Sequence, residues 1–451
     1  MTLDSAYLRG RLADLIAEHD VPGAALGVLH DGRIVDVAAG VLNKAIGVRA
    51  TPDSLFQIGS ISKIWTTTLL MQLVDEGKLD LDVPVAEVLP GFAVADPALT
   101  KAVTTRHLLN HTSGIDGDVF TDTGRGDDCV ETYVAQMAGV ARNHPIGATF
   151  SYCNSGFVLA GRIVEHLTGM SWDAALRERL VEPLGLTHTV TLPEEALRYR
   201  AALGHVGATD PQPAPASMLP RSMGPAGLIS ARVHDVLSFA RMHLSDGRAA
   251  DGEQVLSPDS AAAMTRHEVD LPNPHLDHSW GLGWHRAEWD GQQVFGHNGA
   301  TIGQLAFLQV LPSRGLAVSI LTNGGRADNL VAELYGEIFA ELGGITVPPR
   351  VSPPEQPVSV DFTPHLGTYR RNGVTTEAVE RDGKLVLKVE ITGPLASTQP
   401  SHELELVPLA DGRFAAQQPR AVSWSPVRFY TLDDGTEYVH VGHRASPKVN
   451  N

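Results

Sequence analysis

A serine and a lysine three positions apart, Ser60 and Lys63, are the residues whose types and spacing most directly suggest chemistry. They follow an extended run at 54–58 and precede a segment at 64–74 whose apolar residues recur at helical spacing. If the helix begins at or just after Ser60, the two side chains share one helical face. A serine hydroxyl becomes a good nucleophile when a base takes its proton, and a partly desolvated lysine can be that base.

The spacing of this pair also fits an ordinary helix start, with a capping serine and a solvated lysine, so partners elsewhere must decide. A second short motif, Tyr152 and Asn154, stands just before a helix predicted at 157–167. Irregular backbone there lets both side chains point into one cleft. A phenol near a lysine can exchange protons, and an amide can hold a lysine and a substrate carbonyl together. Alone, this motif fits a turn with a packed tyrosine equally well.

A third motif, His297-Asn298-Gly299, lies on a predicted strand. Each of the three motifs is weak by itself. Because chance matches in this order, each at a fitting structural position, are rare, together they indicate one active site.

The elements that must position these residues form two predicted domains. Asp31-Gly32 joins two apolar runs and indicates a hairpin. Strand patterns occur at both ends of 1–346 and helical patterns in its middle, which predicts an antiparallel sheet with a helical insertion. Six prolines fall in 347–364, a stiff linker. Short alternating runs in 365–451 predict a small antiparallel β-barrel or sandwich.

Composition excludes several classes of partner. A net charge of -17 over 451 residues argues against nucleic acid or an anionic membrane as the main partner. The two cysteines exclude a disulfide scaffold. The N-terminus enters an amphipathic helical pattern without a signal peptide, and no apolar run is long enough to span a bilayer, so we expect a cytoplasmic protein.

In these motifs the sequence resembles the serine β-lactamase and penicillin-binding-protein family, most closely its branch of class C β-lactamases, D-amino-acid peptidases and esterases. The resemblance extends over residues 10–345. It is carried by S-x-x-K, Y-x-N and H-x-G and by four flanking runs: Phe56-Gln57-Ile58-Gly59-Ser60, Glu76-Gly77-Lys78-Leu79-Asp80-Leu81-Asp82, His107-Leu108-Leu109-Asn110-His111-Thr112-Ser113-Gly114 and Pro183-Leu184-Gly185-Leu186. It implies an α+β fold in which helices lie on the faces of an antiparallel sheet beside a helical subdomain.

The resemblance also implies roles for individual residues. Ser60 would be the nucleophile, Lys63 and Tyr152 the proton-handling pair, and Asn154 an orienting residue. The oxyanion hole would be the backbone N–H groups of Ser60 and Ala300.

One departure from the family pattern bears on the substrate. Its β-lactamases and carboxypeptidases usually carry a lysine where this chain has His297, and a histidine is near neutral at pH 7. β-Lactams should therefore be poor substrates. With histidine at this position the motif resembles that of D-peptidases, esterases and penicillin-binding-protein-type thioesterases. Those thioesterases are stand-alone enzymes that release and cyclise nonribosomal peptides. Those thioesterases are also similar in length and in carrying a small lipocalin-like domain.

We therefore expect an acyl-enzyme on Ser60, formed from a small peptide or a peptidyl thioester that a carrier protein can present. The leading interpretation is a peptide macrocyclase. A D-stereospecific peptidase, amidase or esterase and a non-catalytic binding protein are alternatives. The barrel is either a stabilising cap or a wall of the cleft; in the second case Arg444 is the candidate cation for a substrate carboxylate.

Neither a metal nor another cofactor is expected. His107 and His111 have metal-ligand spacing but lack the rest of a zinc motif, which favours packing or capping roles. His275, His278 and His285 are too irregularly spaced to indicate a metal. A G-x-S-x-G elbow is absent from the sequence, which excludes the α/β-hydrolase interpretation.

Overall fold

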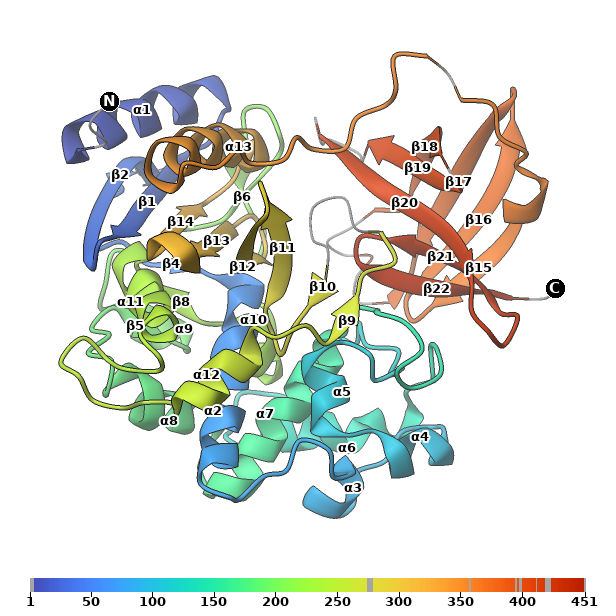
Figure 1. Cartoon of the computed structure of the whole chain (residues 1–451), viewed down its shortest axis with the longest axis horizontal. Coiled ribbons are helices and arrows are strands. Elements are labelled where there is room, and N and C mark those ends of the chain that lie inside the picture. The colour runs from blue at the N-terminus through green and yellow to red at the C-terminus, as the bar shows by residue number, and fades with distance from the viewer. Residues whose placement is uncertain are drawn as a thin grey trace.

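An antiparallel sheet forms the centre of the first domain (Figure 1). The computed structural model describes residues 4–273, 279–356, 358–393, 396, 400–410, 412–417 and 423–449. In this part of the chain the sheet has nine strands in the order β3-β2-β1-β14-β13-β12-β11-β10-β9. Their bounds are β1 Gly23–His30, β2 Arg33–Asn43, β3 Val48–Arg49, β9 Val269–Asp270, β10 Ser279–Trp280, β11 His285–Trp289, β12 Gln292–Ala300, β13 Leu305–Leu311 and β14 Leu316–Thr322.

The first hairpin shows why this sheet starts early in the chain. His30 pairs with Arg33, and the two turn residues Asp31 and Gly32 have φ of +49° and +74°. A two-residue turn with positive φ at both positions matches the twist of the flanking strands. The hairpin predicted at Asp31-Gly32 is present.

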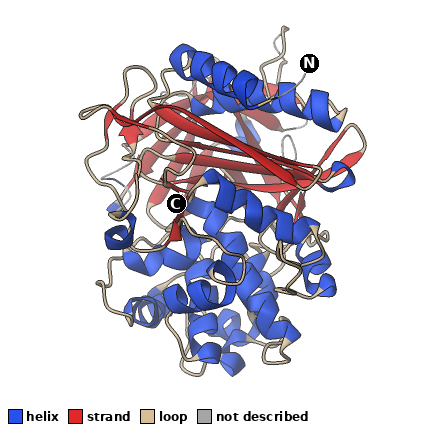
Figure 2. Ribbon diagram, turned by 90° about the vertical axis from the view of Figure 1, so that its left-hand side faces the viewer, coloured by secondary structure: helices blue, strands red, loops and turns tan. Residues whose placement is uncertain are grey.

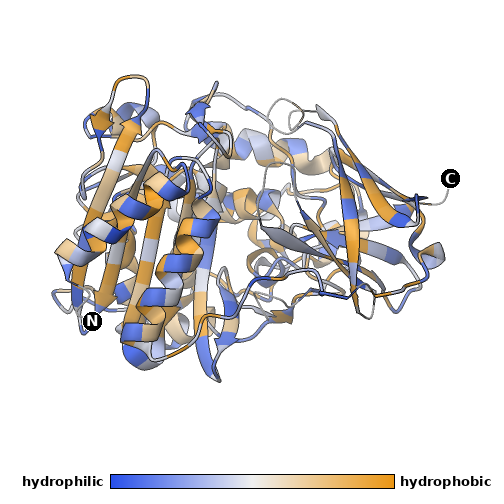
Figure 3. Ribbon diagram, turned by 90° about the horizontal axis from the view of Figure 1, so that it is seen from above, coloured by the Kyte–Doolittle hydropathy of each residue, from blue (hydrophilic) through white to orange (hydrophobic). Residues whose placement is uncertain are grey.

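Helices cover both faces of the sheet, as the side view shows (Figure 2). Helix α1 (Ser5–Glu18) and helix α13 (Ala327–Ile338) lie on one face, and α11 (Val233–Leu244) and α2 (Ser62–Asp75) lie on the other. Side chains of β1 alternate between the two cores, with Leu26 facing the first pair of helices. Figure 3 shows hydrophilic bands on the covering helices and mostly hydrophobic strands behind them.

A helical subdomain fills the middle of the chain. Its longer helices are α6 (Cys129–Gln136) and α7 (Asn154–Thr168). Its shorter helices are α3 Val85–Val88, α4 Pro97–Ala102, α5 Thr105–Leu109, α8 Trp172–Leu176, α9 Pro193–Ala196, α10 Gly224–Gly227 and α12 Pro258–Met264. The first domain also contains the short strands β4 Phe56–Gln57, β5 Thr189–Val190, β6 His205–Val206, β7 Gln212–Pro213 and β8 Ser230–Ala231. Within the described residues, no helix is both long and apolar enough to cross a bilayer.

The C-terminal domain is a closed barrel whose strands are paired in chain order, with β15 closing against β22. Described residues of the linker from 347 to 362 form neither helix nor strand. The barrel interior is packed with buried side chains such as Leu385, Leu387 and Phe414. Its strands are β15 Gly367–Arg371, β16 Val374–Arg381, β17 Lys384–Ile391, β18 His402–Ala410, β19 Arg413–Gln417, β20 Trp424–Thr431, β21 Glu437–Val441 and β22 Arg444–Val449. The predicted α+β fold with a small all-β barrel is confirmed.

Candidate active site

Ser60 lies in a tight turn just before α2, and two glycines allow a strand to approach it. The turn Gly59–Ile61 is a 3₁₀ helix, and Gly59 has φ of +53°. A Cβ on Gly59 would lie 2.5 Å from the backbone nitrogen of Ala300, and a Cβ on Gly299 would overlap the Ile58 carbonyl. Glycine at both positions therefore lets the end of β12 lie against the turn. The backbone N–H groups expected to form the oxyanion hole are thus close together, and Ser60 itself stays partly exposed.

Lys63 is fully buried and makes three polar contacts. Its Nζ lies 3.1 Å from Ser60 Oγ, 2.8 Å from Asn154 Oδ1 and 2.7 Å from the backbone oxygen of Ala226. Burial, assisted by the positive charge of Arg444, lowers the pKa of Lys63 well below its ordinary value. The neutral amine is therefore populated at a lower pH than in an ordinary lysine.

These contacts determine where the lone pair of the neutral amine points. The amide oxygen of Asn154 and the carbonyl oxygen of Ala226 only accept hydrogen bonds, so they take both N–H groups of a neutral –NH₂. The remaining direction is toward the Ser60 hydroxyl, which can donate its proton. This arrangement can perform general-base activation of a serine.

Tyr152 contributes a protonated phenol beside Ser60. Burial raises the pKa of its hydroxyl, and Ser60 offsets part of that rise. The hydroxyl makes no hydrogen bond of regular geometry with another described protein group. Its ring stacks on His111 with centroids 4.2 Å apart, and Lys63 Nζ lies 4.9 Å from the ring centroid. The ring contacts thus hold Tyr152, and its protonated hydroxyl can donate to a reacting group.

His297 is buried on β12, beside the same cluster. Its Nδ1 lies 2.6 Å from the backbone oxygen of Asn298, so that nitrogen carries the proton. Burial, with Lys63 nearby, holds the pKa of His297 well below its ordinary value, so the ring is neutral at pH 7. Nε2 lacks a partner among the described residues and offers a lone pair. The Asn298 side chain is exposed.

The tip of the barrel touches the Tyr152 segment directly. The backbone N–H of Tyr152 donates to the His443 carbonyl at 2.8 Å, and the backbone N–H of Ala445 donates to Ser151 Oγ at 3.1 Å. The amide of Asn143 donates to the Ala445 carbonyl at 2.8 Å. These contacts attach the barrel to the segment that carries Tyr152.

Arg444 lies beside Tyr152, with its guanidinium carbon 5.2 Å from the ring centroid. It is not a solitary cation, because its Nε and Nη2 donate to the carboxylate of Asp118. The Arg444 side chain is 25% exposed, and its Nη1 donates to the Gly442 carbonyl at 2.9 Å.

Three groups at this site were not singled out from the sequence: Asp118, Arg371 and the Ala226 carbonyl. A backbone carbonyl carries no sequence signal. Asp118 lies in the short run Asp116-Gly117-Asp118, and two acidic residues so close together on an apolar background were the available clue. Arg371, which belongs to the C-terminal barrel, pairs with Asp118 at a distance of 3.0 Å.

The histidines with metal-ligand spacing have other partners. His107 caps α5 together with Thr104, and His111 Nδ1 accepts the backbone N–H of Cys153 at 3.0 Å. His275 and His278 lie outside the described residues.

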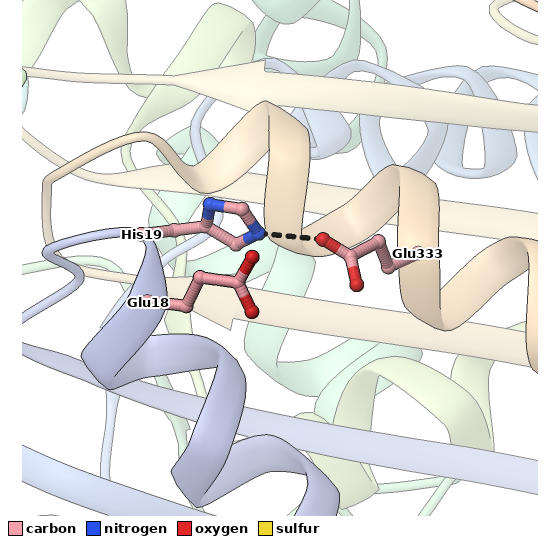
Figure 4. A group of neighbouring side chains, drawn as sticks. All are labelled: Glu18, His19 and Glu333. Atoms are coloured by element: carbon pink, nitrogen blue, oxygen red, sulfur yellow. Dashed lines mark hydrogen bonds and ion pairs between the residues drawn. The ribbon is translucent and has the colours of Figure 1, made fainter.

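A third group with metal-ligand atoms, Glu18, His19 and Glu333, joins the end of α1 to α13 (Figure 4). His19 Nε2 lies 2.7 Å from Glu333, and Arg11 pairs with the same carboxylate at 2.8 Å. The positive charge of Arg11 so close to Glu333 disfavours the binding of a metal ion there. We therefore interpret this group as an ion pair between helices.

Comparison with known proteins places this geometry in a family. The sequence profile described as Beta-lactamase matches residues 8–340. The chain therefore belongs to the β-lactamase family, and the resemblance seen in its motifs is confirmed. Penicillin-binding protein 4 of Amycolatopsis lactamdurans is 49% identical over 378 residues, covering 83% of this chain and 99% of that protein.

Two solved structures are also similar. The crystal structure of SurE has a TM-score of 0.79 at 27% identity and covers 99% of both chains, and a further SurE structure contains D-Leu. A D-stereospecific amidohydrolase from Streptomyces sp. has a TM-score of 0.59 at 26% identity, covering 76% of this chain and 99% of its own. The predicted class of a serine hydrolase or acyltransferase of this family is confirmed at that level.

Proposed function

We propose that this protein is a serine acyltransferase that macrocyclises a peptide through an ester on Ser60. The observation that carries the acyl-transfer step of the proposal is the set of contacts around Lys63, because two acceptors occupy its hydrogens and leave the lone pair for Ser60. The contact between Ser60 and Lys63 also disfavours a purely binding role, because a binding protein would need neither a nucleophile nor a base.

The first step transfers the acyl group. Ser60 Oγ attacks the thioester carbonyl, its proton passes to the neutral amine of Lys63, and the C–S bond breaks. Tyr152 donates its proton to the departing thiolate, which leaves as a thiol, and the proton held by Lys63 then restores the phenol of Tyr152. The backbone N–H groups of Ser60 and Ala300 stabilise the oxyanion.

The second step resolves the ester. The N-terminal amine of the peptide attacks the ester carbonyl, a C–N bond forms, and the C–O bond to Ser60 breaks. Lys63 takes the proton of the amine and returns one to the Ser60 oxygen. The product is a cyclic peptide one water lighter than the linear acid.

The choice of peptide chemistry is supported by the neighbours and by the barrel. Likeness to SurE extends over 99% of both chains, the barrel included. The D-Leu in one SurE structure and the D-stereospecific amidohydrolase both favour a D-configured residue at the acylated end. A peptidyl thioester presented by a carrier protein would fit the exposed edge of Ser60.

Hydrolysis of the same ester is the second candidate, and the D-stereospecific amidohydrolase favours it. The discriminating experiment supplies a peptidyl N-acetylcysteamine thioester with a free N-terminus and a C-terminal D residue. Mass spectrometry of the product should show the dehydrated cycle. Exclusive formation of the linear acid from an efficiently consumed substrate would contradict the cyclase and leave the hydrolase.

Arg444 should recognise a carboxylate on the substrate. Arg444→Ala is expected to raise KM by about tenfold for a substrate with a free carboxylate, as for the loss of a charge-assisted hydrogen bond. Steady-state kinetics on a matched pair, the same peptide with the carboxylate free or amidated, checks this. An equal change in KM for both members would mean that Arg444 does not contact the substrate.

A further inference from the structure

Asp118 is a buried carboxylate between the active site and the barrel. It is 7% exposed, and four donors from three segments reach it. Asn154 Nδ2 donates to Oδ1 at 2.9 Å, Arg371 Nη1 lies 3.0 Å from Oδ2, and Arg444 contacts both oxygens. Burial alone would raise the pKa of Asp118, but Arg444 and Arg371 bring it below its ordinary value. The group is therefore an ionised carboxylate, which only accepts hydrogen bonds.

This acceptor determines which way the Asn154 amide faces. An amide has one donor end and one acceptor end, and a carboxylate can be paired only with the donor end. The Asn154 amide nitrogen must face Asp118, so its oxygen faces Lys63 at 2.8 Å. With the amide reversed, N–H groups would face the Lys63 amine and take its lone pair in place of Ser60.

The barrel holds this carboxylate in place. Both arginines that pair with Asp118 belong to barrel strands, Arg371 at the end of β15 and Arg444 at the start of β22. A second tie lies next to it, where the backbone N–H of Asn372 donates to Asp116 at 2.6 Å. The Asp118 segment is thus attached to the barrel at both of its carboxylates.

We propose that Asp118, held by Arg371 and Arg444 of the barrel, is a positioning residue that fixes the Asn154 amide with its oxygen toward Lys63. Through this chain of contacts the barrel contributes to the reactivity of Ser60. The inference rests on the proposed acyl transfer, since it concerns the base of that reaction.

The test measures acyl transfer by full-length variants on the peptidyl thioester. In Asp118→Asn, the new amide can present N–H groups to Asn154 and let it reverse. On a thioester without a free carboxylate, which Arg444 does not need to bind, we expect kcat to fall by about tenfold or more while KM stays within about twofold, because the lost contact then acts on the base. Arg371→Gln should lower kcat in the same direction by a smaller factor.

Two exposed residues of the same segments serve as matched controls. Asp122→Asn changes an exposed aspartate further along the same loop, and Arg370→Gln changes an exposed arginine of β15. Both should keep the kcat of the wild type. Thermal unfolding of each variant shows whether it is folded at the assay temperature.

A reciprocal exchange separates positioning from a structural role. Asn154→Asp alone sets two carboxylates against each other, and Asp118→Asn combined with Asn154→Asp restores one donor and one acceptor. The double variant should have a higher kcat at its optimal pH than either single variant. If both single variants acylate like the wild type, or if the exchange gives no recovery, the positioning role of Asp118 is refuted.

Failure of the proposed function would look different. In that case the wild type itself would form no adduct with the thioester. An active wild type with unaffected Asp118 variants leaves acyl transfer standing and refutes only the role of Asp118.

Discussion

Replacing Lys63 with methionine should lower the rate of Ser60 acylation by about a thousandfold, within the range that general-base catalysis contributes. Methionine has similar length and fills the same buried space, but it has no lone pair able to take a proton from the hydroxyl 3.1 Å away. Stopped-flow measurement of thiol release from a peptidyl thioester reports this step directly. Lys78→Met, at an exposed lysine just beyond the end of α2, is the matched control and should acylate normally.

The pH dependence of the acylation rate is an independent test of the role of Lys63. Burial, with help from Arg444, lowers the pKa of Lys63, so its neutral form becomes populated well below the range in which a free lysine titrates. Activity should therefore rise with pH along an acid limb that reports Lys63. Lys63→Met should lose this limb. A variant that retains both the rate and the limb would rule Lys63 out as the base.

Tyr152→Phe is the second change with a large expected effect. The ring contacts with His111 and Lys63 survive in phenylalanine, while the buried hydroxyl that stays protonated at neutral pH is lost. Without a donor for the leaving thiolate, we expect the acylation rate to fall by about a hundredfold.

Substrates with different leaving thiols check the reason for that loss. The deficit in Tyr152→Phe should be largest for alkyl thiols, which need a proton to leave, and smallest for acidic aryl thiols. Tyr199→Phe, at a tyrosine whose hydroxyl donates to the Thr187 carbonyl on the surface, is the control. An equal deficit for both kinds of thiol would contradict the donor role.

Much of the architecture follows from local sequence chemistry. Asp31-Gly32 predicts its hairpin because only certain residues tolerate positive φ at both turn positions. The barrel is predicted by short alternating runs, and the motifs containing Ser60, Tyr152 and His297 do meet in space. Such features depend on residue type and spacing, which a sequence displays.

Features that depend on tertiary contacts could not be predicted. Ser60 lies in a 3₁₀ turn because the strand end at Ala300 packs against it, and α2 begins only at Ser62. The ion-pair partners of Asp118 are Arg371 and Arg444, which lie 253 and 326 positions further along the chain.

The position of the barrel is the clearest example of a feature that the sequence does not predict. Its contact with Tyr152 passes through the backbone carbonyl of His443, a group that every residue has. Only the three-dimensional arrangement brings the end of the chain next to Tyr152. In the proposed mechanism, residues of both domains therefore lie at the site around Ser60.

The most direct test of the whole mechanism is the mass of the protein after reaction with a peptidyl thioester whose N-terminus is acetylated, which removes the intramolecular amine. The mechanism predicts a mass increase equal to the acyl group, mapped to the tryptic fragment containing Ser60 and missing in Ser60→Ala. An adduct on another residue, or full turnover by Ser60→Ala, would contradict the central claim that this hydroxyl is the nucleophile.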